Sequence, residues 1–424
     1  MKAGFPFAFL LFAAACASSS SPCKSGFDVD DLDDSGISQS LKDEIFDSGK
    51  IIGKKHSEYP SGKVVVIRAA SPDWESNPAV TRDYVDGVFF DDDSTPKTMH
   101  TWFRYNSWGQ FLITEGATPG WITVPKKLTN YENGIEDNTE YMRDVLKLAD
   151  VNWSALDANN NGKIADAAAQ IVILIPNAMP GSGFASVRSV SIGSVNTPDG
   201  TFDFGERRIV YFSVKATADP TSASEPIRSR QAVAHELAHA FFNLPDRYGA
   251  ESGTGSYDIM ATTYTWTMFT MPDRVKIGWI KPKILDAHDG RCLQFGASEL
   301  RTDALIVVPP KELRKATGVL EYWVVEYRKK LDADGYDGEL PENGLAVWYV
   351  ATGTYSAGWD DVRLVQFDKS DRDPDRYKNP AADALFKRDD GNPRRLLLDR
   401  TKQWTLLYFE NVSDAGGQFM WAEF

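Results

Sequence analysis

Histidine and cysteine are both scarce in this chain, which has five histidines and three cysteines among 424 residues. No two cysteines form a C-x-x-C pair, so a zinc site built from thiolates is excluded. Basic residues are also outnumbered, with 46 lysines and arginines against 60 aspartates and glutamates and a formal net charge of −14. A nucleic-acid partner would call for a basic face, so we expect no such partner.

The sequence also lacks an apolar run long enough to span a membrane. Its one strong apolar run lies at the N-terminus and is too short for that. A basic residue, an apolar run over residues 5–12 and small residues before Cys16 predict a secretory signal peptide over residues 1–15. Its end resembles a bacterial lipoprotein cleavage site, although Ala13 stands where that pattern has leucine. We expect an exported protein that meets a membrane only through a lipid on Cys16; simple secretion is the alternative.

Residues 16–61 are acidic and weakly apolar, which predicts a lipoprotein tether or a short pro-segment. The aspartates of residues 28–34 could hold calcium, but we favour a solvated acidic linker. If Cys16 carries a lipid, Cys23 and Cys292 remain and could form a disulfide.

Hydrophobic patterning divides the rest of the chain at about residue 290. Apolar runs predict buried strands at 63–67, 170–175 and 208–213, and helical spacing predicts a helix over 138–148. Later segments are short, aromatic and β-branched, and they predict strands at 304–308, 320–327, 345–350, 362–367, 404–409 and 418–424. We therefore expect an α/β (α+β) domain over residues 62–290, followed by an all-β sandwich-like domain over residues 291–424.

Two of the five histidines, His235 and His239, lie four residues apart in the sequence H-E-L-A-H. On a helix they would share one face, where two imidazoles can hold one zinc ion. Glu236, between them, can reach a water polarised by the metal and act as its general base. We expect Ser224 to cap the start of this helix and Asn243 to end it in a left-handed conformation.

A hydrolytic zinc site needs three protein ligands and one open position for water. Asp246, just past the helix end, is the expected third ligand, although an aspartate after proline is also a common turn residue. Met260 lies about 20 residues after the helix and could lie beneath the metal; core filling is the alternative. Tyr248 and Tyr264 could donate to an oxyanion, and a structural role is the alternative for each.

A second polar motif places Asp157, Asn159 and Asn161 at alternate positions before a glycine, like the first half of a calcium-binding loop. The glutamate of the twelfth position is absent, and Asp166 could substitute for it. A polar turn stabilised by asparagine and glycine explains the same residues, so both interpretations stay open.

These segments together resemble the immune inhibitor A family of secreted bacterial zinc metallopeptidases, which belongs to the metzincin group. The resemblance covers roughly residues 62–424. Besides the zinc motif it rests on Y-N-S-W-G-Q at 105–110, the loop at 157–166, L-P-D-R-Y at 244–248, Y-D-I-M at 257–260, R-V-K-I-G-W at 274–279, E-Y-W-V-V-E-Y-R at 321–328 and G-L-A-V-W at 344–348. The interval between the second histidine and L-P-D is one residue longer than in that family, with Phe242 and Asn243 in place of a glycine. This longer spacing resembles that of the immunoglobulin A peptidase family.

The resemblance implies a metzincin-like catalytic domain in which His235, His239 and Asp246 bind Zn²⁺, Glu236 is base and then acid, and Met260 lies beneath the metal. It implies a monomeric, exported zinc endopeptidase that acts on a protein or glycoprotein, with Ca²⁺ as a second cofactor if the 157–166 loop binds it. The alternatives are a catalytically weak or inactive surface-binding lipoprotein and a zinc hydrolase that acts on glycopeptide or cell-wall substrates.

Overall fold

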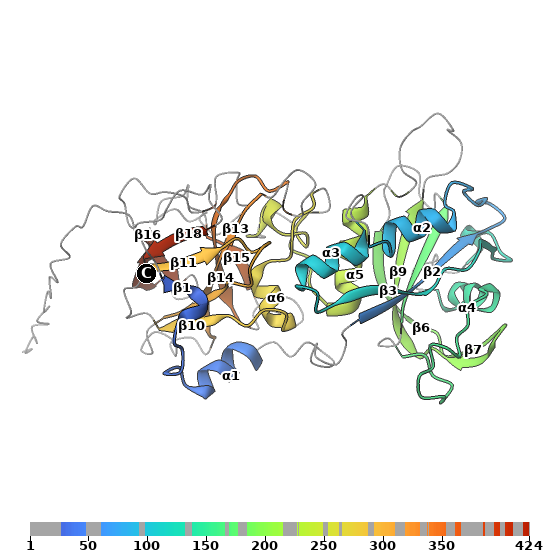
Figure 1. Cartoon of the computed structure of the whole chain (residues 1–424). Coiled ribbons are helices and arrows are strands. Elements are labelled where there is room, and N and C mark those ends of the chain that lie inside the picture. The colour runs from blue at the N-terminus through green and yellow to red at the C-terminus, as the bar shows by residue number, and fades with distance from the viewer. Residues whose placement is uncertain are drawn as a thin grey trace, which may run out of the picture.

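The computed structural model describes most of the chain between residues 27 and 423 (Figure 1). The described ranges are 27–47, 61–92, 98–131, 138–165, 169–176, 185–214, 229–248, 253–262, 265–286, 292–309, 319–330, 339–352, 361–365, 394–398, 403–409 and 419–423, with the single residues Ile227, Asp337 and Leu385. Within them the fold is a mixed α+β one, with several sheets and few helices. No helix in these ranges is long and apolar enough to cross a membrane.

The largest sheet has six strands and contains the buried strands expected from the sequence. Its main path runs in the order β3 (Leu112–Ala117), β2 (Ser61–Ala70), β5 (Gln170–Pro176), β9 (Glu206–Val214) and β6 (Ala185–Ser191), while β4 (Ile122–Thr123) pairs with β2. All pairs are parallel except β6 with β9, which is antiparallel. The strand predictions at 63–67, 170–175 and 208–213 are confirmed.

Helices cover both faces of this sheet, which explains why its central strands read as continuous apolar runs. One face, with Val172 and Val210, packs against α2 (Arg82–Phe89), α3 (Met99–Asn106) and α5 (Arg230–Phe242). The other face, with Ile173 and Tyr211, packs against α4 (Thr139–Leu148). The helix predicted over 138–148 is therefore confirmed.

The later strands form a five-stranded sheet and a three-stranded sheet. The five-stranded sheet has the order β10 (Lys283–Asp286), β12 (Leu305–Val308), β13 (Glu321–Arg328), β14 (Gly344–Ala351) and β15 (Asp361–Leu364). The three-stranded sheet has the order β1 (Phe27–Asp28), β11 (Cys292–Gly296) and β18 (Phe419–Glu423). A second core lies between them, where Phe295 of β11 joins Val325 and Val347. Two hairpins complete the strands: β7 (Ser194–Thr197) with β8 (Gly200–Asp203), and β16 (Arg394–Leu398) with β17 (Gln403–Phe409).

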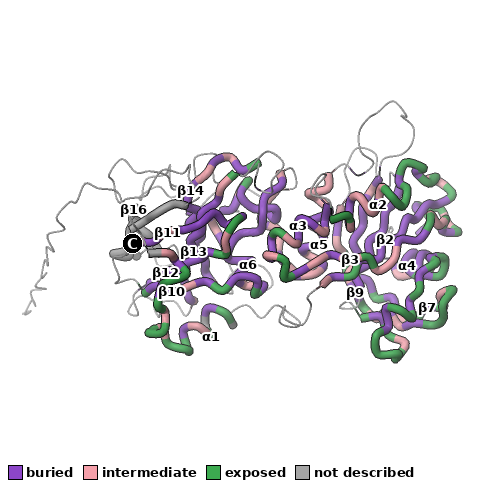
Figure 2. Tube along the Cα trace, viewed as in Figure 1, coloured by how far each residue is buried: buried purple, intermediate pink, exposed green. Residues whose placement is uncertain are grey.

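The six-stranded and five-stranded sheets share one continuous apolar core. The helix α6 (Met271–Ile277) lies between them in Figure 1, and its Met271 and Val275 belong to that core, as do Val324 and Trp348 of the five-stranded sheet. Figure 2 shows buried chain, in purple, in the strands of both sheets, with partly exposed segments between them. Phe242, the last residue of the H-E-L-A-H helix, and Leu244 just after it belong to this core as well.

The beginning of the described chain differs from the solvated acidic linker expected from its aspartates. β1 pairs in parallel with β11, and Val29 in the 3-10 helix η1 (Val29–Asp31) is fully buried in the second core. Farther along, α1 (Gln39–Asp47) buries Leu41 and Ile45. Apolar residues spaced between the aspartates explain the difference, because they pack inward while the carboxylates stay outside. Arg301 pairs with Asp28 at 2.8 Å.

Several predictions concern parts of the chain that the structure does not describe. Residues 1–26, with the expected signal peptide, Cys16 and Cys23, lie outside the described ranges, as do Asp166, Ser224 and Tyr264. Cys292, which is described, is disulfide-bonded.

Candidate metal centre

The helix that carries the H-E-L-A-H sequence is capped by a side chain at its start and by a backbone amide at its end. It begins at Arg230, where the hydroxyl of Ser229 accepts a hydrogen bond from the Ala232 amide, so the predicted cap at Ser224 is wrong. Asn243 ends the helix in the left-handed region with φ of 54°, as predicted. Asparagine adopts this conformation more readily than most residues, which lets the chain turn back toward the helix.

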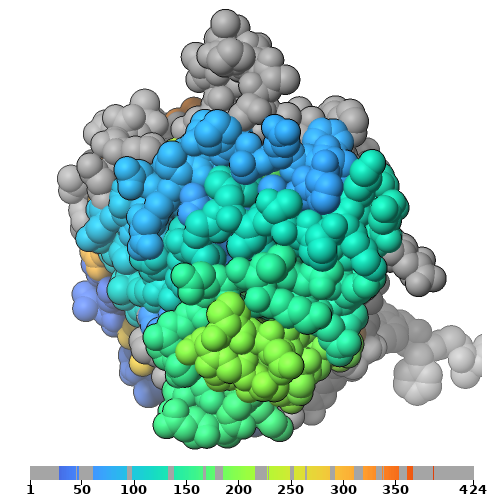
Figure 3. Space-filling view, turned by 90° about the vertical axis from the view of Figure 1, so that its right-hand side faces the viewer, coloured from blue at the N-terminus to red at the C-terminus, as the bar shows by residue number. Residues whose placement is uncertain are grey.

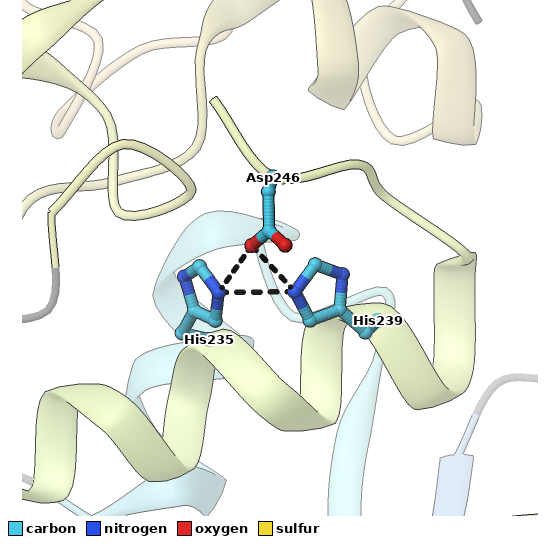
Figure 4. Close-up of side chains that lie close together, drawn as sticks. All are labelled: His235, His239 and Asp246. Atoms are coloured by element: carbon cyan, nitrogen blue, oxygen red, sulfur yellow. Dashed lines mark hydrogen bonds and ion pairs between the residues drawn. The ribbon is translucent and has the colours of Figure 1, made fainter. Parts of the chain in front are cut away.

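The turn brings Asp246 over the two motif histidines (Figure 4). Its Oδ1 atom lies 3.0 Å from His235 Nε2 and 3.1 Å from His239 Nε2, and the two nitrogens are 3.0 Å apart. A point about 2.0 Å from all three atoms, the usual length of zinc bonds to nitrogen and oxygen, lies roughly 1 Å out of their plane. The longer interval after His239 therefore still brings the aspartate to the two histidines.

The outer nitrogens of both imidazoles face backbone carbonyls. His235 Nδ1 lies 2.9 Å from Ile259 O, and His239 Nδ1 contacts Leu244 O. A carbonyl oxygen only accepts hydrogen bonds. Each neutral ring must therefore carry its proton on Nδ1, which leaves a lone pair on Nε2. Two imidazole lone pairs and a carboxylate then converge on one point. Three acceptors in contact repel one another unless a cation lies between them, so the donor set fits a metal ion.

The surroundings of the site favour positive charge at this point. Burial would lower the pKa of His235, but its hydrogen bonds to Asp246 and to the Ile259 carbonyl outweigh burial and raise it. Partial burial would raise the pKa of Asp246, but the two histidines hold it well below its usual range. Both shifts stabilise a carboxylate beside a cation, whether that cation is a proton on imidazole or a metal.

Glu236 lies on the same helix between the two histidines and is almost entirely buried. Burial raises the pKa of its carboxyl group, and the neighbouring histidines oppose that shift. A carboxylate with a raised pKa accepts and returns protons more readily near neutral pH. The Asp246 side chain, by contrast, is 45% exposed, so the metal-facing side of the site is open to solvent.

Met260 lies in a tight turn that contacts the site through its backbone. The Ala261 amide donates to Asp258 O at 3.0 Å, and the preceding carbonyl, Ile259 O, faces His235. Met260 itself is fully buried in the main core. The turn therefore supports His235 through the Ile259 carbonyl, and Met260 fills the core that the same helix covers.

The polar loop at Asp157 folds as a turn closed by its own carboxylate. Asp157 Oδ2 accepts from the Gly162 amide at 2.7 Å, and Oδ1 accepts from the Asn161 amide at 3.2 Å. The loop pairs with β8 through Ile164 and Asp203; Figure 3 shows the β7–β8 hairpin in yellow-green against the green loop region. Among the described residues, Asp157 is not part of a cluster of three histidines, cysteines or acids, and Asn159 and Asn161 contribute only amides. Calcium binding here stays a prediction.

Sequence reasoning missed the charged residues that support the turn before and after Asp246. Arg247 is buried against Asp258 and Asp273, and Arg208 contacts both the end of the motif helix and Asn243. The sequence does carry a local signal: Arg247 stands directly beside Asp246, and Arg208 begins the apolar strand segment 208–214. Their partners lie as far as 35 residues away, so the pairing itself could not be read from the sequence.

The chain matches no protein-family model, and a search of curated proteins finds no match to it. The resemblance to the immune inhibitor A family therefore stays a prediction that rests on the motifs quoted above.

Proposed function

We propose that this protein is an exported zinc-dependent endopeptidase with a metzincin-like catalytic region. The observation that carries the proposal is the convergence of His235 Nε2, His239 Nε2 and Asp246 Oδ1 within 3.1 Å of one another, with Glu236 on the same helix. Two imidazoles and one carboxylate are a donor set typical of catalytic zinc, whereas calcium and magnesium favour oxygen ligands alone.

Each residue has a chemical role in this proposal. Bound zinc would polarise a water molecule and the substrate carbonyl. Glu236 would accept a proton from that water as the water oxygen forms its bond to the substrate carbonyl carbon. It would then deliver the proton to the amine nitrogen as the carbon–nitrogen bond breaks. The Ile259 and Leu244 carbonyls would hold the two imidazoles in the ligand tautomer.

The sheet edge beside the motif helix supports a peptide substrate. Among the described strands β6 ends the six-stranded sheet, and it is antiparallel to β9, its neighbour. The motif helix α5 contacts both strands. An open strand edge can pair with an extended chain through main-chain hydrogen bonds, which would present a peptide bond to a site next to it.

The remaining features of the proposal concern location and partners. We propose that residues 291–424 form a β-sandwich-like domain, that residues 1–15 direct export, and that a lipid on Cys16 makes the only membrane contact. We propose a monomer that acts on a protein or glycoprotein. A calcium ion at the Asp157 loop would be structural.

The proposal is tested by measuring zinc content and casein cleavage for residues 16–424, which keep all three cysteines, in the wild type and in Glu236→Gln. We expect about one zinc per chain in both proteins and cleavage by the wild type alone, because the amide cannot take up the proton. Zinc in both with cleavage in neither would favour a narrow hydrolase or a binding protein, and purified cell wall and a mucin would then separate these two. A wild type without zinc would overturn the proposal.

A further inference from the structure

The turn that delivers Asp246, residues 243–247, is contacted by Arg208 from β9 at its start and ends with a second arginine, Arg247. Arg208 belongs to β9 and meets the start of the turn. Arg247 is the last residue of the turn, and its guanidinium points into the region of α6. Neither arginine contributes an atom to the cluster of His235, His239 and Asp246, and Arg208 contacts His239 only at its backbone carbonyl.

Arg208 joins the helix end to the turn. Its Nη1 donates to His239 O at 2.8 Å, and its Nη2 donates to Asn243 Oδ1 at 2.6 Å. The same carbonyl, His239 O, accepts from the Asn243 amide at 3.0 Å. A cation at a helix C-terminus is favourable, and here it also fixes the left-handed residue from which the turn departs.

Arg247 holds the other end of the turn. Its amide donates to Met260 O at 2.8 Å, and its Nη2 donates to Asp273 Oδ1 at 2.7 Å. Nη1 contacts Asp273 as well and donates to Asp258 Oδ2 at 3.2 Å. All three side chains are almost fully buried, so neither solvent nor salt screens the pairs.

The Arg247 pairs connect the turn to the five-stranded sheet. Asp258 and Tyr257 are neighbours in the chain, and Tyr257 O accepts from Arg328 Nη1 of β13 at 3.2 Å. Arg328 is itself held by Asp337, whose carboxylate also accepts from the Met268 amide just before α6. The third ligand is thus fixed through buried polar contacts that reach the later part of the chain.

We propose that Arg208 and Arg247 are positioning residues that hold the 243–247 turn from its two ends and thereby fix Asp246 over the histidines. This inference rests on the proposed metal site. The turn is one residue longer than in the family that its motifs resemble, and a longer turn has more conformations to lose when a ligand is fixed. Both arginines restrict those conformations before a metal binds, which lowers the entropy cost of binding.

The test compares zinc affinity in Arg208→Lys, Arg247→Lys and Asp273→Asn, measured on metal-free protein by competition with a chelating dye. Lysine keeps the positive charge but cannot donate two parallel hydrogen bonds, so each arginine variant loses the two-donor hydrogen-bond geometry and keeps the charge. We expect the Kd for zinc to rise about 10- to 100-fold in each variant, as for other residues that orient metal ligands. The absorption spectrum of the cobalt-loaded protein should change as well, because the coordination geometry changes. Arg247→Lys combined with Asp273→Asn should weaken binding little beyond either single change.

Arg207→Lys is the matched control, since Arg207 neighbours Arg208 on β9 but is buried on the opposite face, where it donates to Ala169 O at 2.5 Å. It should lower thermal stability and leave zinc affinity unchanged. A Kd within about twofold of the wild type in both Arg208→Lys and Arg247→Lys, or an equal loss in Arg207→Lys, would overturn the inference while leaving the peptidase proposal intact. A wild type that binds no zinc would overturn both. If circular dichroism shows that Arg247→Lys does not fold, the zinc Kd of Arg208→Lys, at a half-buried position, tests the inference instead.

Discussion

The ring of Tyr248 lies nearly parallel to that of His235, with 6.1 Å between the centroids and 23° between the planes. Tyr248 is nevertheless 61% exposed, so much of its side chain lies at the solvent side of the candidate metal centre. Partial burial and a hydrogen bond to Asp246 raise the pKa of this phenol to about 12. The hydroxyl therefore stays protonated over the working range of pH and can donate.

Tyr248→Phe should lower kcat for casein cleavage by about 10²-fold without loss of zinc, since one donor to developing negative charge is removed. The measurement is kcat and KM together with zinc content. Tyr131→Phe is a suitable control, because Tyr131 also donates to a carboxylate, that of Asp144 at 3.1 Å, but packs against the opposite face of the six-stranded sheet. An unchanged kcat in Tyr248→Phe would show that the phenol has no part in catalysis.

Removing the metal should destabilise the protein, because the three acceptors of His235, His239 and Asp246 then face one another without a cation. At free zinc about 1,000 times above Kd, binding adds about 4 kcal/mol to the free energy of unfolding. Thermal unfolding with zinc and with a chelator measures this difference. His239→Ala should abolish most of this difference. His100→Ala should preserve it, because His100 lies on α3 and its imidazole contacts Ile113 O of β3. Equal melting temperatures with and without zinc in the wild type would contradict the metal site.

The parts of the fold that could be predicted are those whose signal is local. The strand at 170–175 and the helix at 138–148 were predictable because continuous burial and helical spacing are written in adjacent residues. β1 was not, because its two residues form a strand only through pairing with Leu293 and Gln294, which lie in a distant part of the sequence. Pairing across such a distance leaves no periodic pattern in either segment.

The candidate site divides in the same way. His235, Glu236 and His239 were predictable from their spacing on one helix, and Asn243 from its tolerance of a left-handed conformation. The arrival of Asp246 at the two histidines depends on how the turn is held, and the arginines that hold it act through partners in distant elements. The helix start was misplaced because Ser224 and Ser229 are both acceptable caps, and only the tertiary structure selects between them.

Asp303 should make stability fall as the pH rises toward neutral. Burial raises its pKa to about 6, although Gly296 N and Arg301 donate to its carboxylate. The folded state binds the Asp303 proton more tightly than the unfolded state does. Its contribution to the free energy of unfolding is therefore fully present below about pH 4 and is lost as the pH passes 6. Urea unfolding measures this effect. From pH 4.5 to 7.5 the free energy of unfolding of Asp303→Asn should rise relative to that of the wild type by on the order of 1 kcal/mol. A constant difference between the two proteins would refute the shift.

Val29 should contribute to folding, because it is fully buried between the three-stranded and five-stranded sheets. Val29→Ala removes two methyl groups from a packed core and should lower the free energy of unfolding by about 1–3 kcal/mol. Chemical denaturation measures the loss, and Asp31→Ala, at an exposed position two residues away, should cost less than about 0.5 kcal/mol. Equal stability in the two variants would mean that this segment behaves as the linker its aspartates suggested.

Asp157 should stabilise its loop whether or not calcium binds there. Its carboxylate accepts from the Asn161 and Gly162 amides, and the chain passes through left-handed conformations at Asn160 and Gly162 to make that contact. Asp157→Ala leaves both amides without this acceptor and should lower the free energy of unfolding by about 1–3 kcal/mol with calcium chelated. Asp199→Ala, which removes an exposed carboxylate that accepts from the Ser154 amide at 2.7 Å, should cost less because water replaces that acceptor.

Thermal unfolding in calcium and in chelator then separates the two interpretations of the loop. A melting temperature that rises with calcium in the wild type and not in Asp157→Ala would establish a calcium site. A melting temperature that does not change with calcium in either protein would favour a turn held by the Asp157 side chain alone.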